Sequence, residues 1–94
     1  MFIDDFVWLP DIVEKLEVKH RVSQDEVEEV FFAAPKYRFV ESGHRLGEDV
    51  YSAGGQTDNG RYLLVFFIHK SNNTALILSA RDMDSGERKR HGRK

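Results

Sequence analysis

Two arginines stand at the ends of two strands that the sequence predicts as neighbours. The residue pattern predicts one strand over 61–69 and the next over 75–81, so that Arg61 begins the first strand and Arg81 ends the second. In an antiparallel pair these two ends lie at the same edge of the sheet. Because a guanidinium stays charged and can bond two oxygens at once, two convergent arginines would suit a phosphate group.

Lys19 and His20 end the first predicted helix, and they are candidates for positioning a ligand or transferring a proton, since histidine ionises near neutral pH. Each of these groups also has a purely structural interpretation. A Lys-His pair at a helix C-terminus often complements the carbonyl end of the helix dipole. Arg81 can instead form ion pairs with neighbouring carboxylates, which belong to Asp82, Asp84 and Glu87.

A basic run follows the last predicted strand. Arg88, Lys89 and Arg90 are candidates for contacts with nucleic-acid phosphates. The alternative for residues 88–94 is a solvated, disordered end. No metal or other cofactor is expected, because the chain has no cysteine and its histidines share no spacing typical of metal ligands. Those histidines are His20, His44, His69 and His91.

The composition fits one compact domain, since 94 residues with 40% hydrophobic content leave room for a single core. No apolar run approaches the length of a membrane span. The first residues include Asp4 and Asp5, where a signal peptide would carry positive charge. We therefore expect a cytoplasmic protein with no membrane-bound part.

The charge changes sign along the chain. Residues 1–35 hold nine acids against three lysines and arginines, whereas the remainder holds eleven lysines and arginines against seven acids. Such an asymmetry is typical of a protein with one face toward a polyanion, although an ordinary solvated surface is the alternative. We predict that the acidic half and the basic sheet have separate roles, with a polyanion approaching the sheet.

Two helices are predicted in the first 35 residues. Pro10 opens the first, which should stop near His20. The second begins at Ser23, where Ser23 and Glu26 form a capping box and Val22 and Val27 a hydrophobic staple. Its expected core positions are Val27, Val30, Phe31 and Ala34.

Four strands should follow, over residues 36–41, 48–56, 61–69 and 75–81. Asp58-Asn59-Gly60 favours a tight turn, and Asp84 to Glu87 could cap a short last helix. The expected fold is α+β, with two N-terminal helices packed on one face of a four-stranded antiparallel sheet and a short C-terminal helix. Residues 1–94 would form one domain with a basic tail from about 88.

An ordered set of short motifs resembles the BrnT family of bacterial toxins and covers residues 6 to about 91. The matching motifs are Trp8, Lys19-His20, Val22-Ser23, Val30-Phe31, Gly55-Gln56-Thr57, Gly60-Arg61, Ser79-Ala80-Arg81 and Glu87-Arg88. The chain departs from the family pattern where charged or polar residues are usual, at Leu9, Ile12, Leu16, Asp49 and Leu76. Arg45 could replace one of the missing cations.

The resemblance implies a RelE-like, metal-independent endoribonuclease that cleaves RNA and thereby inhibits translation and growth. In this reaction a ribose 2′-hydroxyl attacks the adjacent phosphate, which calls for proton transfer and for positive charge on the phosphorane. Its catalytic candidates would be Lys19, His20, Arg61 and Arg81. Its RNA-binding candidates would be Arg45, Arg88, Lys89 and Arg90.

The resemblance also implies a partner, a BrnA-like ribbon-helix-helix antitoxin that contacts the predicted helices. Any contact with DNA would be indirect, through that antitoxin. The departures leave open a second hypothesis, a catalytically degenerate protein of the same fold that binds an antitoxin-like partner or RNA without cleavage. A third hypothesis, a helix-turn-helix DNA reader over residues 10–34, is disfavoured because its second helix begins with acids.

Overall fold

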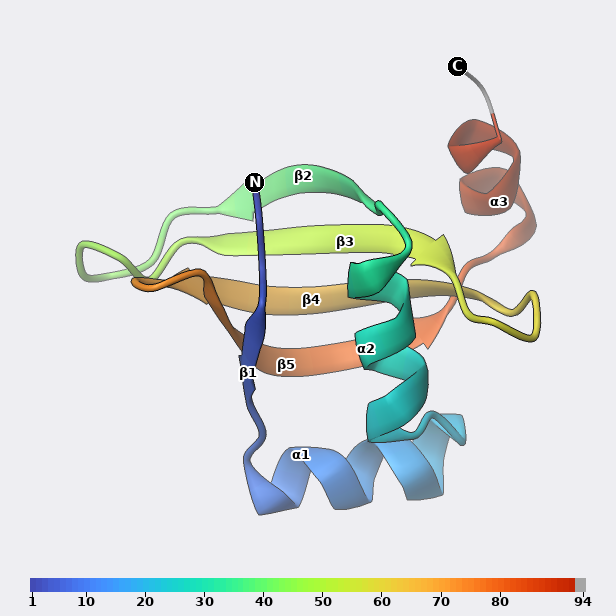
Figure 1. Cartoon of the computed structure of the whole chain (residues 1–94), viewed down its shortest axis with the longest axis horizontal. Helices are drawn as coiled ribbons and strands as arrows, with labels where there is room; N and C mark the ends of the chain where they lie inside the picture. The colour runs from blue at the N-terminus through green and yellow to red at the C-terminus, as the bar shows by residue number, and fades with distance from the viewer. Residues whose placement is uncertain (93–94) are drawn as a thin grey trace.

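A five-stranded sheet forms the centre of the structure, a computed structural model that describes residues 1–92 (Figure 1). The strands are β1 (Asp5–Val7), β2 (Lys36–Glu41), β3 (Val50–Gln56), β4 (Tyr62–Lys70) and β5 (Thr74–Asp82). Their order across the sheet is β1-β5-β4-β3-β2. The four longer strands pair antiparallel in sequence order, as the sequence predicts, to within two residues at each end.

The prediction of four antiparallel strands is nevertheless wrong in detail, because β1 makes the sheet mixed. This strand of three residues pairs parallel to β5, with Phe6 opposite Ala75. Three residues are too few to show a strand period, so only the partner strand defines β1 as a strand.

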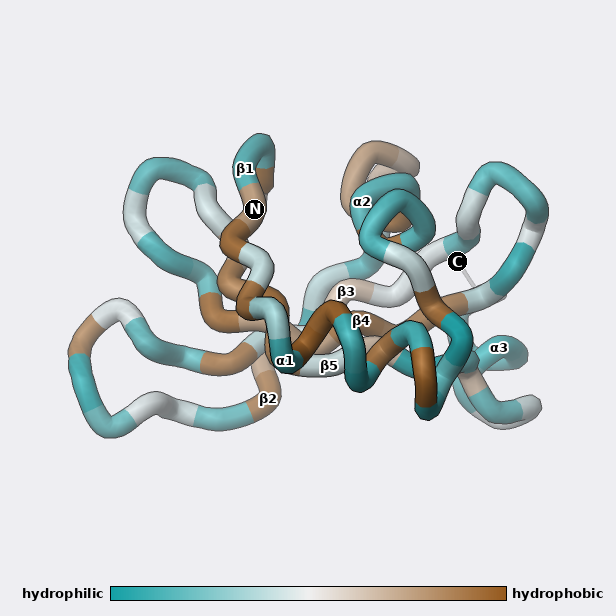
Figure 2. Tube along the Cα trace, turned by 90° about the horizontal axis from the view of Figure 1, so that it is seen from below, coloured by the Kyte–Doolittle hydropathy of each residue, from teal (hydrophilic) through white to brown (hydrophobic). Residues whose placement is uncertain are grey.

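The helices occupy three different positions around the sheet (Figures 1 and 2). The first, α1 (Pro10–Lys15), continues into a π-helical segment, η1 (Leu16–His20), and the two lie along the β5 side of the sheet. Helix α2 (Gln24–Phe32) lies across one face, whereas α3 (Ser85–His91) lies on the opposite side. The expectation that both N-terminal helices cover one face is therefore corrected: only α2 does.

The helix ends follow from local sequence chemistry. Segment η1 ends at His20 because Arg21 adopts a left-handed conformation with φ of 53°. Ser23 caps α2 in a capping box with Glu26, as predicted. An equivalent box between Asp84 and Glu87 begins α3. These caps satisfy N–H groups that have no partner inside the helix.

The core lies between α2 and the sheet. Leu63, Val65 and Phe67 of the central strand β4 are fully buried there, against Val27 and Val30 of α2. The intervening residues of β4 are partly exposed on the other face. Two faces of different chemistry result: one covered by α2, and a more open face on the side of α3.

Two of the family departures are explained by this core, and one core prediction is wrong. Leu16 is fully buried and Ile12 packs against the core, so both substitutions add apolar packing. Ala34 is exposed instead of buried, because its φ of 50° ends α2 before that position. In the described part of the chain, no helix is both long and apolar enough to cross a membrane.

Candidate functional site

Arg61 is bound by protein groups on every side. Its Nε and Nη2 donate to the Asp82 carboxylate, with Nε 2.7 Å from Oδ1. Nη1 contacts the Glu26 carboxylate at 3.2 Å. The same guanidinium donates to the main-chain carbonyls of His20 at 2.9 Å and Arg21 at 2.7 Å, so it closes the C-terminal end of η1. All the nitrogen donors of Arg61 have partners, so this side chain links η1 and α2 to the sheet.

Lys19 and His20 lie at this same end of η1, beside Arg61. The side chain of Lys19 is exposed. The hydrogen bond from Arg61 is the main cause that lowers the pKa of Asp82, and the positive charge of His20 lowers it further. Three of the predicted catalytic residues are thus brought together at one end of η1. They are Lys19, His20 and Arg61.

Arg81 lies on the other face of the sheet. It pairs in register with Leu64, whereas Asp82, which binds Arg61, pairs with the buried Leu63. Its Nη1 lies 2.7 Å from Glu87 Oε1 and its Nη2 2.9 Å from Oε2, so the two side chains form a two-pronged pair. The predicted convergence of Arg61 and Arg81 on one phosphate is therefore wrong, and the predicted alternative of an Arg81–Glu87 ion pair is confirmed.

The Arg81–Glu87 pair attaches α3 to the sheet, and its contribution to the free energy of unfolding should depend on pH. Hydrogen bonds from Arg81 and from the Asp84 main chain lower the pKa of Glu87 from 4.5 to about 2. A lowered pKa gives stability that is present above about 4.5 and is lost as the pH falls toward 2. We expect the free energy of unfolding, measured in urea, to decrease more between pH 5 and pH 2.5 in the wild type than in Glu87→Gln. Equal decreases would contradict this assignment.

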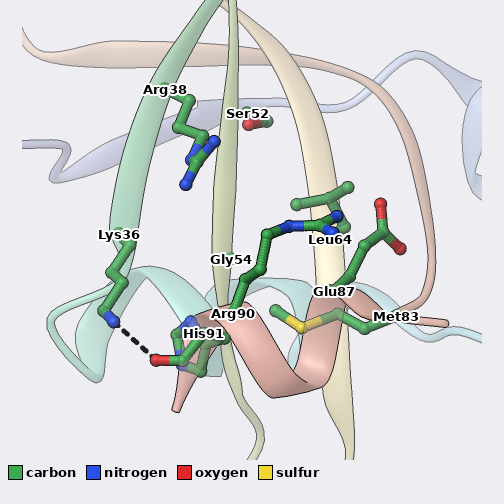
Figure 3. A pocket seen from close by; sticks show the side chains of 9 residues that line it. All are labelled: Lys36, Arg38, Ser52, Gly54, Leu64, Met83, Glu87, Arg90 and His91. Atoms are coloured by element: carbon green, nitrogen blue, oxygen red, sulfur yellow. Dashed lines mark hydrogen bonds between the residues drawn. The ribbon is translucent and has the colours of Figure 1, made fainter. Parts of the chain in front are cut away.

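A groove of about 260 Å³ lies between α3 and the open face of the sheet (Figure 3). Its lining combines cations, one imidazole and a small apolar floor, from strands β2, β3 and β4, from α3 and from the residue that follows β5. The lining residues are Lys36, Arg38, Ser52, Gly54, Leu64, Met83, Glu87, Arg90 and His91.

The alternation of the strands explains why these residues meet. Lys36 pairs with Gly54, and Arg38 pairs with Ser52, so the side chains of Lys36, Arg38 and Ser52 point to the face opposite α2, where Gly54 leaves space between them. Gly54 lies directly under Met83 and His91, since a Cβ there would lie 3.0 Å from Met83 Cε and 3.8 Å from His91 Nδ1. A Cβ at position 54 would require the flexible end of Met83 to shift, and it would be in ordinary van der Waals contact with His91.

Helix geometry supplies the other wall. Glu87, Arg90 and His91 are spaced three and four residues apart, so they share one face of α3. Lys36 fixes the end of the helix, because its Nζ donates to the main-chain carbonyl of His91. The groove is thereby closed at one end by a contact between β2 and α3, as Figure 3 shows.

The groove carries positive charge with little internal compensation. Within residues 1–92, neither Arg38 nor Arg90 forms an ion pair, and Glu87 is engaged by Arg81. Burial, followed by the charge of Lys36, lowers the pKa of His91 below its usual 6.5. A groove with free guanidinium groups and a neutral imidazole can bind an anion and accept a proton.

The predicted RNA-binding residues occupy different places. Arg90 lines the groove, whereas Arg88 stacks over the Tyr62 ring, with its Cζ 4.8 Å from the ring centroid. Lys89 is exposed beside Arg88, and Arg45 is exposed in the loop between β2 and β3. Residues 88–91 belong to α3, so the expected basic tail is helical there; positions 93–94 lie outside the described residues.

Sequence reasoning missed four polar residues of the groove, which are Lys36, Arg38, Ser52 and His91. Lys36 and Arg38 alternate along a correctly predicted strand, and this spacing indicates that they share a face. His91 follows Glu87 by four residues on a capped helix, which indicates a shared helix face. The sequence does not show that α3 packs against the sheet face that carries these side chains, because this depends on tertiary packing.

The charge reversal along the sequence corresponds to a spatial division. The acids of residues 1–35 lie on β1, α1, η1, α2 and their connections, whereas the groove between α3 and the sheet is cationic. In the part of the chain that the structure describes, no three histidine, cysteine or acidic side chains gather in a way that could hold a metal ion.

A comparison with protein families gives a match over most of the chain. Residues 8–87 match the family model described as "Ribonuclease toxin, BrnT, of type II toxin-antitoxin system". The match spans most of the chain, from Trp8, two residues before α1, into the first turn of α3. No curated relative matches the sequence.

Proposed function

This chain belongs to the BrnT family of ribonuclease toxins of type II toxin–antitoxin systems, and from that premise we propose that it cleaves RNA in the groove between α3 and the sheet. The reaction would be a metal-independent endonucleolytic cleavage that inhibits translation and growth in the cytoplasm. The ribose 2′-oxygen attacks the neighbouring phosphorus, so the site must neutralise an additional negative charge in the transition state.

The observation that carries the proposal is the pair of arginines at the groove. Arg38 on β2 and Arg90 on α3 line it from two sides, and neither forms an ion pair within residues 1–92. Two guanidinium groups facing one space suit an internucleotide phosphate. Arg81 would support this site indirectly, since its contact with Glu87 holds α3 in place. Catalytic roles for Lys19, His20 and Arg61 remain predictions.

The partner would be a BrnA-like ribbon-helix-helix antitoxin, which itself binds the operator DNA. We assign its contacts to α1 and α2, because the acids of this region would repel RNA and attract a basic partner. Phe32 of α2 is an exposed apolar side chain on this side.

The direct test is cleavage by the purified protein. A mixed RNA pool, both free and bound to ribosomes, is incubated with the protein in EDTA, and the product ends are identified. We expect 2′,3′-cyclic phosphates and 5′-hydroxyls. Should the wild type prove inert on both substrates, the alternative of a degenerate BrnT protein that binds without cleavage would replace this proposal.

RNA affinity should fall steeply with salt concentration. Each phosphate contact that is formed releases condensed counterions, so the logarithm of the binding constant falls linearly with the logarithm of the salt concentration. A non-cleavable 2′-O-methyl RNA allows this to be measured by fluorescence anisotropy. We expect Arg90→Ala to reduce the slope by about 1, and Lys15→Ala on α1 to leave it unchanged. A flat salt dependence in the wild type would contradict an electrostatic site.

A further inference from the structure

We propose that His91 is a catalytic residue that accepts the proton of the attacking ribose 2′-hydroxyl. This inference rests on the ribonuclease function proposed above and deepens it. His91 lies beyond the segment that matches the family model, which ends at residue 87, so the family match does not assign it a role. Its position in the groove supports this role.

The imidazole is held in the groove by the backbone below it and a ring beside it. Its Nδ1 lies 3.8 Å from the point where a Cβ would stand at Gly54, so the ring approaches the strand where the side chain is missing. The Tyr62 ring contacts it edge-on, with centroids 6.0 Å apart. Lys36 holds the main-chain carbonyl of the same residue. The imidazole is thus placed against β3 and β4, and the main chain of the same residue is held by β2.

The charges around His91 favour its neutral form. Lys36 and Arg38 face the groove from β2, Tyr62 lies beside the ring from β4, and Glu87 and Arg90 come from α3. The one carboxylate in this set, Glu87, is bonded to Arg81 and to the main-chain N–H of Asp84. No free carboxylate in the groove lining stabilises the imidazolium, so a neutral ring that can accept a proton predominates near pH 7.

The step balances with His91 as the base. The 2′-hydroxyl proton moves to the imidazole, the 2′-oxygen forms a bond to phosphorus, and the bond from phosphorus to the 5′-oxygen breaks. The leaving 5′-oxygen takes a proton from water, and the imidazolium returns its proton to the solvent. Arg38 and Arg90 lie at the same groove, where they can stabilise the phosphorane while its charge develops.

The test compares His91→Ala with His44→Ala on a ribose-containing RNA, over a range of pH. His44 is an exposed loop histidine outside the groove and serves as the matched control. Proton transfer by a positioned side chain commonly contributes a hundredfold or more. We expect kcat to fall about a hundredfold in His91→Ala with little change in KM, and the rise of kcat with pH in the acidic range to disappear. Added imidazole should restore part of the rate.

Several outcomes would overturn the assignment. A His91→Ala rate within a few-fold of the wild type, or an unchanged acidic limb, shows that another group takes the proton. A loss of rate that imidazole does not restore, together with raised KM, indicates that His91 only holds α3 in place. In both cases the proposed function of the groove stands if Arg38→Ala cleaves RNA more slowly than the wild type. If the wild type cleaves neither free nor ribosome-bound RNA, both the proposed function and the role of His91 are rejected.

Discussion

Replacing Arg38 with alanine is expected to lower the rate of RNA cleavage about a hundredfold, since that is the usual cost of removing one group that stabilises the transition-state charge. The fold should persist, because Arg38 lies on an edge strand and makes no ion pair within residues 1–92. Arg38→Lys should recover only part of the rate, because a point charge cannot make the two-pronged contact. Initial rates on a defined RNA, with the free energy of unfolding measured in parallel, test both expectations.

The control for this experiment is Lys15→Ala. Lys15 is an exposed cation on α1, on the β5 side of the sheet and away from the groove. Removing it changes the net charge by the same amount and should leave cleavage unchanged. Equal losses in the two variants would mean that only the overall charge matters, and cleavage at the wild-type rate by Arg38→Ala would place the phosphate elsewhere.

Replacing Arg61 with alanine is expected to lower the free energy of unfolding by about 2 kcal/mol, the scale of losing hydrogen bonds to charged groups. The change removes the bonds to Asp82 and Glu26 and leaves the His20 and Arg21 carbonyls without their donor. The Arg61 side chain is only 26% exposed, whereas that of Asp82 is 60% exposed and better screened by solvent, which limits the loss. Urea unfolding measures the difference.

Arg45→Ala serves as the stability control, because it removes an exposed loop cation with no ion pair in the described segment. It should change the free energy of unfolding by less than about 0.5 kcal/mol. If Arg61→Ala proved as stable as Arg45→Ala yet lost cleavage, Arg61 would be the phosphate-binding residue that the sequence suggested, and the structural role would be wrong.

The helices and the long strands were predictable because their signals are local. Capping boxes at Ser23 and Asp84 fix where two helices begin, and strand composition with turn residues marks the four antiparallel strands. Strand β1 was missed because three residues carry no period and depend on β5 for their structure. The π-helical form of η1 was likewise not visible in the spacing of Ile12 and Leu16.

The placement of the two arginines could not be predicted, because a β-bulge decides it. The register between β4 and β5 shifts between Phe66 and Phe67, which leaves Leu78 as an extra residue in β5. With strict alternation, Arg81 would share a face with Ile77, on the side of Arg61. The bulge turns Arg81 to the open face and puts Asp82 against Arg61 instead. The sequence pattern does not indicate this change of register between β4 and β5.

The groove was missed for a related reason. Its residues come from several elements that are separated in the sequence, and they meet only where α3 packs on the open face of the sheet over Gly54. The alternation of Lys36 and Arg38 indicated a shared face, but not that α3 would cover it. The positions of single elements were thus predictable, whereas the site depends on how those elements pack.

RNA binding in the groove between α3 and the open sheet face is open to direct observation. The most direct measurement is a titration of ¹⁵N-labelled protein with 2′-O-methyl RNA, followed by NMR chemical shifts. We expect the largest shift changes at Arg38, Ser52, Gly54 and His91, with small changes along α2. Changes that concentrate at residues 23–34 or at the end of η1, with the groove unaffected, would contradict it.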